Sequence, residues 1–378
     1  MTRPFYSVSR LAVINTLSVR RWAVIPMIAA LAACSNDDSG SSVTTIDLDV
    51  QVGQEDFNEA MVRRVTVDET GMPSEVQPGV LNFARFTTDD EGQAVVTADG
   101  TEIVYLDVYG RESNDGTSTT RRCQVVNGCG SVSFGSEYSI VAAPGWRSVA
   151  AGIEDGQRIR VTPLTDLAAQ LAFDRVFSES SGTQQDAGWV ATGFYSVYST
   201  LQAESQVSRL FGIDSVQSRE PADLTQIEEW RGANQTEAQY SIRYGALLAA
   251  WQSYELSYTS TTDLPSFASA VAADLVANDG QLIQRGGSQT LSMYDLYDAA
   301  VNNLNALDVT DSTVSGYVAS VISQLQSERD AFVDGALTSI TPASLSSLLG
   351  DELEDYQLGI QRLNAEQDLQ NAVNELWQ

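Results

Sequence analysis

The stretch Val161-Thr162-Pro163-Leu164-Thr165-Asp166-Leu167-Ala168 divides this sequence into two halves with different periodicity. Before it, apolar and polar residues alternate, as they do in a strand with one buried face. After it, apolar residues recur every three or four positions, as they do in an amphipathic helix. Thr162 followed by Pro163 is typical of a helix N-terminus, because threonine caps the first turn and proline fits there. The stretch therefore predicts a boundary between a β-domain and an α-helical domain.

Residues 45–162 carry the alternating pattern, most clearly in the segment Ile46–Val52. Further alternating segments are Val80–Phe86, Gln93–Val96, Ile103–Tyr109, Val132–Ile140 and Gln157–Val161. Polar turns such as Asp90-Glu91-Gly92 and Ala98-Asp99-Gly100 lie between them. Short strands joined by such turns predict an antiparallel β-sandwich of immunoglobulin-like or transthyretin-like size.

Residues 163–378 are predicted to form an all-α domain, because helical spacing of apolar residues dominates them. The clearest helical segments are Thr236–Leu256, Leu264–Ala277, Ser292–Leu307, Val314–Phe332 and Leu353–Trp377. Glycine and proline residues separate these segments, as expected at helix ends. Tyr240, Tyr244 and Trp251 form a stripe in the first segment, which we interpret as core rather than as a ligand site.

The N-terminus has the pattern of a bacterial lipoprotein signal peptide. Leu31-Ala32-Ala33-Cys34 follows an apolar run, Trp22–Ala30, which is preceded by two arginines. The run is too short to span a bilayer core of about 30 Å, so a transmembrane helix is the weaker interpretation. We therefore expect residues 1–33 to be removed, Cys34 to be acylated and residues 34–44 to form a flexible tether. Serine after the cysteine favours transfer to the outer membrane.

Composition excludes several chemistries. The chain has no histidine, and all 21 of its basic residues are arginines. It therefore cannot form a Ser-His-Asp triad, a Cys-His pair, a Schiff-base lysine or a histidine metal site. Carboxylate chemistry, tyrosine or serine with an unusual base, and an oxygen-ligand metal site remain. We expect a non-enzymatic protein without a cofactor or a metal ion.

The formal net charge of −29 bears on the partners. Phosphate backbones would be repelled by such a surface, so nucleic acid is not an expected partner. Anionic membranes would be repelled as well, so attachment must come from the lipid on Cys34. An acidic surface of this kind suits a salty medium, in which ions screen the repulsion.

Apart from Cys34, the chain has two cysteines, Cys123 and Cys129. An even pair in an exported protein predicts a disulfide, here closing a small loop with Asn127-Gly128 at its turn. A metal site is the weaker alternative, because no further soft ligand is present to complete it.

Several of these segments together resemble a group of largely uncharacterised envelope lipoproteins from Gram-negative, often marine, bacteria. The shared pattern is a lipobox, the loop Cys123-Gln124-x-x-x-Gly128-Cys129, and the junction Val161–Ala168. In the helical half the matching strings are Phe211–Ile213, Pro221–Thr225, Tyr240–Ala250 and Ala272–Leu275. The resemblance implies location and architecture, and it implies no activity.

Some residues suggest three kinds of ligand. Trp146, Trp189 and Tyr195 are candidate ligand-facing aromatics, which would suit a glycan-binding accessory protein. A glycoside hydrolase needs two acids on opposite sides of a cleft. Acid clusters such as Glu228-Glu229 are explained better as helix faces or helix ends. Acidic turns such as Asp89-Asp90-Glu91 could bind Ca²⁺, although a solvated turn is the favoured interpretation.

The sequence therefore predicts a lipid-anchored envelope protein that acts as a binding or structural module at the outer membrane or cell surface. Its expected partners are the membrane, through the lipid, and a glycan or another envelope protein. Two alternatives stay open, a glycan-binding accessory protein and a carboxylate-based glycoside hydrolase.

Overall fold

The structure is a computed structural model, and it describes residues 45–54, 57–67, 71, 73–77, 80–99, 103–110, 118–140, 145–180, 195–258, 267–277, 282 and 290–333. The predicted signal peptide, the tether with Cys34 and the predicted helix Leu353–Trp377 lie outside these residues. Within the described ranges, no helix combines the length and the apolar character that crossing a bilayer requires.

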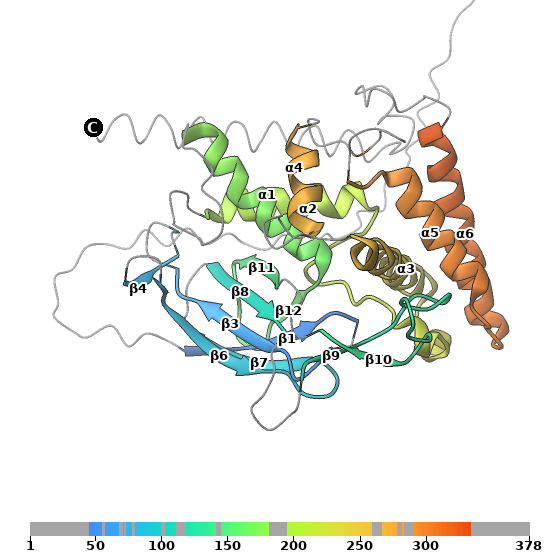
Figure 1. Cartoon of the computed structure of the whole chain (residues 1–378), viewed down its shortest axis with the longest axis horizontal. Coiled ribbons are helices and arrows are strands. Elements are labelled where there is room, and N and C mark those ends of the chain that lie inside the picture. The colour runs from blue at the N-terminus through green and yellow to red at the C-terminus, as the bar shows by residue number, and fades with distance from the viewer. Residues whose placement is uncertain are drawn as a thin grey trace, which may run out of the picture. The chain divides into compact units, whose positions relative to one another are not determined.

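The described chain forms strands first and helices afterwards, which confirms the predicted order (Figure 1). The strands are β1 (Thr45–Val52), β2 (Phe57–Asn58), β3 (Met61–Val65), β4 (Glu75–Gln77), β5 (Val80–Leu81), β6 (Phe83–Thr87), β7 (Gln93–Asp99), β8 (Ile103–Tyr109), β9 (Thr120–Arg122), β10 (Glu137–Ser139), β11 (Trp146–Ala151) and β12 (Arg158–Val161). The helices are α1 (Pro163–Ser180), α2 (Val197–Leu210), the 3₁₀ segment η1 (Leu224–Gly232), α3 (Gln235–Ser257), α4 (Phe267–Ala277), α5 (Met293–Ala306) and α6 (Ser312–Val333).

Two sheets share one core. The first has the strand order β12-β1-β7 and the second the order β11-β8-β3-β6. Alternate residues of both sheets, such as Leu48 and Val50 on β1 and Leu106 and Val108 on β8, are buried in the same apolar cluster. The alternation seen in the sequence at Ile46–Val52 therefore corresponds to a strand with one buried and one solvent-facing side.

The second sheet is covered on its other face as well. Val65, Tyr105 and Val149, from three of its strands, belong to the main apolar cluster of the helices. Helices α1 and α2 pack against β11, and Figure 1 shows the helices gathered on one side of the sheets. A strand buried on both faces loses its alternating pattern, which explains why the sequence did not reveal β11. Strand β3 was missed because Arg63 and Arg64 place a charged residue on each of its faces, which interrupts the alternation of apolar and polar residues.

Most strand pairs are antiparallel, but β12 pairs with β1 in parallel, with Asp49 opposite Arg158. This pairing returns the chain to its first strand just before the helices begin. At the junction, the amide nitrogen of Thr165 donates to the side-chain oxygen of Thr162 at 3.2 Å. The helix start predicted at Pro163 is confirmed.

Helix α3 lies at the centre of the helical part. Ala246, Leu247 and Trp251 on it are fully or almost fully buried, and it contacts α5, α6 and η1. Tyr244 and Trp251 of the predicted stripe belong to the core, whereas Tyr240 stays 37% exposed. The helical half of the molecule therefore packs around one helix, α3, whose middle part is buried.

Candidate functional site

The loop closed by Cys123 and Cys129 is the starting point of the candidate site. A disulfide joins the two residues, whose Cα atoms lie 5.8 Å apart. Gly128 has a φ of 92°, and a Cβ at this position would lie 2.8 Å from the carbonyl oxygen of Val132, so the turn depends on glycine here. The amide nitrogen of Cys129 donates to the same oxygen at 2.8 Å.

Gln124 attaches this loop to the helical part of the chain. Its side chain is fully buried. Its amide nitrogen Nε2 donates to Asp223 at 2.9 Å, and its Oε1 accepts from the amide nitrogen of Leu224 at 3.0 Å. Its backbone nitrogen donates to Oε1 of Gln252 on α3 at 2.9 Å. A buried polar side chain with all these partners fixes the position of the loop, because breaking any bond would leave a buried group unsatisfied.

Asp223 is the common acceptor of this network. Its carboxylate accepts from Gln124, from the amide of Thr225 at 2.7 Å and from Nη1 of Arg122 at 2.7 Å. It also caps η1, because its backbone is extended and its side chain accepts from the first turn. One carboxylate therefore joins strand β9, the disulfide loop and η1.

A groove lies beside this network, and we call it the loop–helix groove. It has a volume of about 490 Å³, which is within the range of ligand pockets. It is lined by Val126 and Phe134 from the disulfide loop region, by Leu224, Thr225, Gln226, Ile227, Glu228 and Glu229 from η1, and by Ala306, Leu307 and Asp308 at the end of α5. Apolar side chains predominate in its floor, and three carboxylates lie among its lining residues.

Both walls of the groove are held by specific bonds. The amide nitrogen of Val126 donates to Oδ1 of Asn303 on α5 at 3.1 Å. The carboxylate of Glu228 accepts from the amide nitrogens of Thr310 at 2.6 Å and Asp311 at 3.2 Å. Arg231 pairs with Asp311 at 2.9 Å. The first of these contacts connects the disulfide loop to α5, and the others connect η1 to the segment between α5 and α6.

The same contacts favour the ionised form of the Glu228 carboxyl group. Hydrogen bonds from the backbone amides of Thr310 and Asp311 hold the pKa of Glu228 below its usual range. A carboxylate held in its ionised form attracts cations and is poorly suited to donate a proton. Glu229 and Asp308 are exposed beside it. The groove therefore offers an apolar floor together with negative charge.

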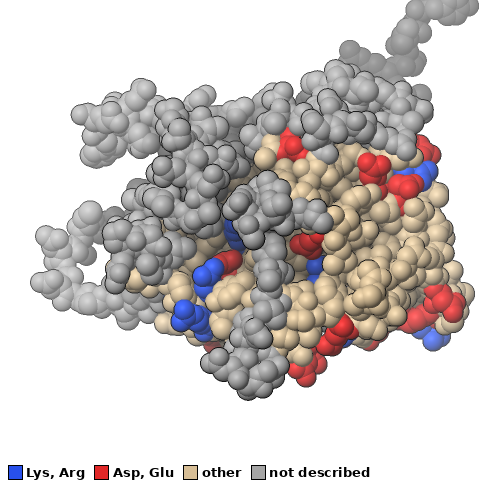
Figure 2. Space-filling view, viewed as in Figure 1, with Lys and Arg blue, Asp and Glu red and all other residues tan. Residues whose placement is uncertain are grey.

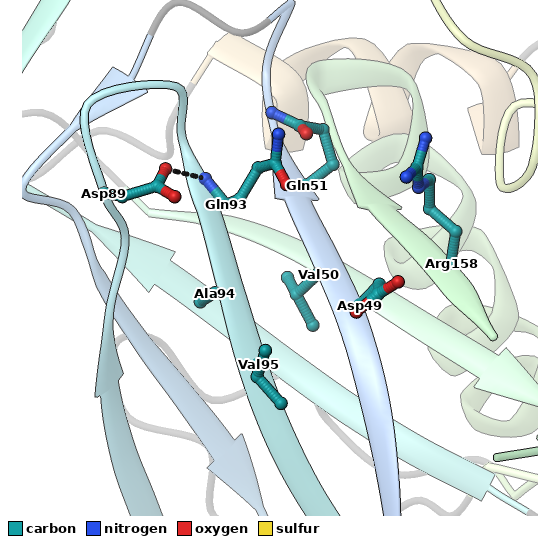
Figure 3. Close-up of a pocket in the computed structure, with 8 residues that line it drawn as sticks. All are labelled: Asp49, Val50, Gln51, Asp89, Gln93, Ala94, Val95 and Arg158. Carbon is teal, nitrogen blue, oxygen red and sulfur yellow. Dashed lines mark hydrogen bonds between the residues drawn. The ribbon is translucent and has the colours of Figure 1, made fainter. Parts of the chain in front are cut away.

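A second, smaller hollow lies on the outer face of the first sheet, with a volume of about 130 Å³ (Figure 3). Two hydrogen bonds shape the turn at its edge. Asp89 accepts from the amide of Gln93 at 2.8 Å, and Nε2 of Gln51 donates to the carbonyl oxygen of Glu91 at 2.7 Å. In the described residues, no group of three or more His, Cys, Asp or Glu residues is placed to hold a metal ion. The acidic turn at Asp89 is thus organised by its own backbone.

Trp146, one of the candidate ligand-facing aromatics, lies in the interior with 6% of its surface exposed. Its ring centroid is 4.6 Å from that of Phe57, and the guanidinium of Arg121 lies 4.6 Å from it. Arg121 in turn pairs with Glu255 on α3 at 2.9 Å. The indole therefore packs where β11, β2 and α3 meet, and it presents no face to solvent.

Tyr195 is 1% exposed and stacks on Tyr105, with ring centroids 5.6 Å apart. Its backbone nitrogen donates to the carbonyl oxygen of Gly71 at 2.8 Å. It takes part in packing between the sheet and the segment before α2. Trp189, the third candidate aromatic, lies outside the described residues, as does Cys34.

Asp166, in the first turn of α1, is a buried carboxyl group beside Arg147. Burial raises the pKa of Asp166 to about 6, although the positive charge of Arg147 acts in the opposite direction. Its Oδ1 lies 3.7 Å from Nε of Arg147 on β11. No sequence pattern indicates this pair, because the two residues come together only when α1 packs on the sheet.

Comparison of the chain with protein-family models, curated proteins and solved structures gives no match. The proposed function therefore rests on the geometry of the site.

The structure brings together segments that the sequence singled out separately. The disulfide loop contacts Pro221–Thr225 through Gln124. Thr162 at the junction lies within hydrogen-bond distance of the hydroxyl of Tyr244 in α3, at 2.8 Å. Arg243, also in α3, donates to the carbonyl oxygen of Phe211 at 2.8 Å. Sequence reasoning missed the groove itself, because its walls come from three segments far apart in the chain.

Proposed function

We propose that this chain is a non-enzymatic binding module of the bacterial cell envelope. In this proposal a lipid on Cys34 holds it at the outer membrane, and the loop–helix groove receives a partner. The lipobox supports the location. The disulfide between Cys123 and Cys129 is consistent with an oxidising compartment outside the cytoplasm.

The observation that carries the binding role is the combination of an apolar floor with negative charge between fixed walls. A preformed groove binds without the entropy cost of ordering its own side chains. The ionised Glu228, with Glu229 and Asp308 nearby, favours a partner with positive charge. The proposed partner is therefore an envelope protein that presents a basic, partly apolar segment.

The β-half would serve as the rigid support of this site. We propose that its two sheets form a sandwich of immunoglobulin-like or transthyretin-like kind, since their inner faces share one apolar cluster. The parallel pair of β1 and β12 would be a local addition to such a fold.

The location is tested by fractionation of cells that express the chain or its Cys34→Ala variant. The unchanged chain should sediment with outer membranes and the variant should be soluble. Protease treatment of intact cells, followed by an antibody to the helical half, would then tell the surface from the periplasmic face. Membrane retention of the Cys34→Ala variant would contradict the lipid anchor.

The groove is tested with a short fluorescent peptide of leucine and lysine and with a second peptide in which glutamate replaces lysine. Ala306→Arg places a bulky cation at an exposed position that lines the groove, whereas Asn305→Arg places one at the neighbouring exposed position outside it. The lysine peptide should bind, and Ala306→Arg should weaken it roughly tenfold more than Asn305→Arg does. Equal binding of both peptides, or equal effects of both variants, would contradict the proposal.

A further inference from the structure

A row of charged residues crosses the second sheet on the face that the helices partly cover. Arg85 on β6 lies opposite Arg63 on β3, Arg63 lies opposite Asp107 on β8, and Asp107 lies opposite Arg147 on β11. Residues opposite each other on neighbouring strands point to the same side of a sheet. The row therefore gathers three arginines around one aspartate in a protein whose net charge is −29.

The acids near this row balance only part of its charge. Asp107 forms an ion pair with Arg63, and Asp166 lies beside Arg147. Arg85 is exposed, and among the described residues it has no ion pair. The Nε atom of Arg63 is buried and has no hydrogen-bond acceptor in the described part of the chain. Counted over the described residues, three arginines face two acids along the row, and Arg85 is the arginine at its exposed end.

Like charges directly opposite each other on two strands are destabilising. Here the ring of Phe83 reduces that cost, since the guanidinium of Arg85 lies 4.6 Å and that of Arg63 5.2 Å from its centroid. Tyr109 supports Arg63 further, at 4.6 Å from its ring centroid. Both guanidinium groups therefore contact the same ring. In Figure 2, arginine side chains gather over β3 and β6.

We propose that Arg85 and Arg63 form a binding site for a phosphate group. Two guanidinium groups on adjacent strands offer more donors than a carboxylate with two oxygens can accept, whereas a phosphate has more oxygens to share between them. The contact with Phe83 leaves the planar edge of the exposed Arg85 guanidinium, which carries N–H donors, for such a ligand. One nitrogen of Arg63 stays with Asp107, so Arg63 contributes its positive charge beside Arg85. The site is independent of the loop–helix groove and reverses the sign of the protein's charge locally.

The phosphate could be free or carried by a lipid headgroup, so both sources are used as probes. The first experiment titrates inorganic phosphate at constant ionic strength, with chloride as the control anion, and follows the arginine Nε–Hε signals by NMR. The second measures co-sedimentation with phosphatidylglycerol vesicles and with phosphatidylcholine vesicles, using protein without the lipid anchor. Moderate salt is used in both, because it screens the long-range repulsion from the acidic surface.

Arg85→Gln is the test variant, and Arg158→Gln is its matched control. Arg158 is also exposed, but it lies on the first sheet beside the smaller hollow. Phosphate should bind the unchanged protein and Arg158→Gln equally, and Arg85→Gln should bind roughly tenfold more weakly. Arg85→Lys should fall between them, since lysine keeps the charge and loses the planar fork. Thermal melting of each variant checks that it is folded.

Binding of free phosphate, or of phosphatidylglycerol vesicles alone, with the expected loss in Arg85→Gln supports the proposal and identifies the source. Three results would overturn it: chloride shifting the signals as phosphate does, equal weakening by Arg85→Gln and Arg158→Gln, or no binding to either probe.

Discussion

The side-chain nitrogen of Gln124 donates to the carboxylate of Asp223 at 2.9 Å, across 99 positions of sequence. Both side chains are buried, and the bond joins the disulfide loop to the start of η1. A loop of this kind would otherwise move on the surface. This bond makes it a fixed wall of the groove.

Gln124→Ala should lower the free energy of unfolding by about 2–3 kcal/mol, because the amide of Leu224 and part of Asp223 lose their buried partner. Chemical denaturation measures the change. Gln226→Ala is the control, because Gln226 is exposed and its Nε2 bonds Asp223 only weakly, at 3.5 Å. Equal effects of the two substitutions would show that the Gln124 network does not hold the loop.

Gly245→Ala should destabilise the protein, although alanine is the better helix former. A Cβ at position 245 would lie 2.2 Å from the carbonyl oxygen of Ala222, and backbone there must move to admit it. We expect a loss of roughly 1–3 kcal/mol. In the matched substitution Gly316→Ala, on α6, a Cβ meets no atom within 4 Å. That variant should gain stability, by about 1 kcal/mol at most. A stabilised Gly245→Ala would contradict the close approach of α3 to Ala222.

The buried carboxyl of Asp166 should make stability depend on pH. Its pKa is raised from 3.8 to about 6 by burial, so between these values the folded chain keeps a proton that the unfolded chain has released. Its contribution to stability is thus fully present below about pH 4 and is lost as the pH rises to about 6.

Asp166→Asn does not titrate, and it isolates this effect. The stability of the unchanged protein relative to the variant should fall by about 2 kcal/mol between pH 4 and pH 7, whatever their difference at one pH. Denaturation curves at a series of pH values measure it. Asp90→Asn, at an exposed turn, serves as the control. A constant difference across this range would exclude a raised pKa for Asp166.

Loss of the disulfide should affect the groove more than the fold. The double variant Cys123→Ser, Cys129→Ser should lose about 2–3 kcal/mol, as expected for a short closed loop. Its lysine-peptide affinity should fall, because Val126 and Phe134 line the groove next to this loop. A reductant should lower the melting temperature of the unchanged protein and leave that of the double variant unaltered. Free thiols in the untreated protein would refute the pairing.

Much of the fold could be predicted from sequence. The strand Ile103–Tyr109 and the helix start at Pro163 occur at the residues where the pattern predicts them. Alternation reports on a face exposed to solvent, which β1 has. β8 and the first turns of α1 are mostly buried, and the start of α1 is indicated by Thr162-Pro163 instead. Strand β11 escaped prediction because it is buried on both faces, and β3 because Arg63 and Arg64 interrupt its apolar pattern.

The candidate site could be predicted only in part. The loop between Cys123 and Cys129 and the segment Pro221–Thr225 are both recognisable as strings. Their contact through Gln124 depends on tertiary packing, so no local pattern reports it. The same holds for Trp146, whose burial follows from Arg121 and Phe57 on other strands. The sequence around an aromatic residue does not show whether its ring contacts a ligand or a neighbouring side chain.

The parallel pairing of β1 with β12 has a consequence for the order in which the protein can fold. β1 can pair with β7 once residues up to Asp99 are available, but its other edge stays open until β12 is available too. Helix α1 follows within a few residues, and only then can the second sheet bury Tyr105 and Val149. The β-half is thus the first part to be made and among the last to be completed. Pairings between segments so far apart in sequence form slowly, so β1 keeps an open edge until the junction folds.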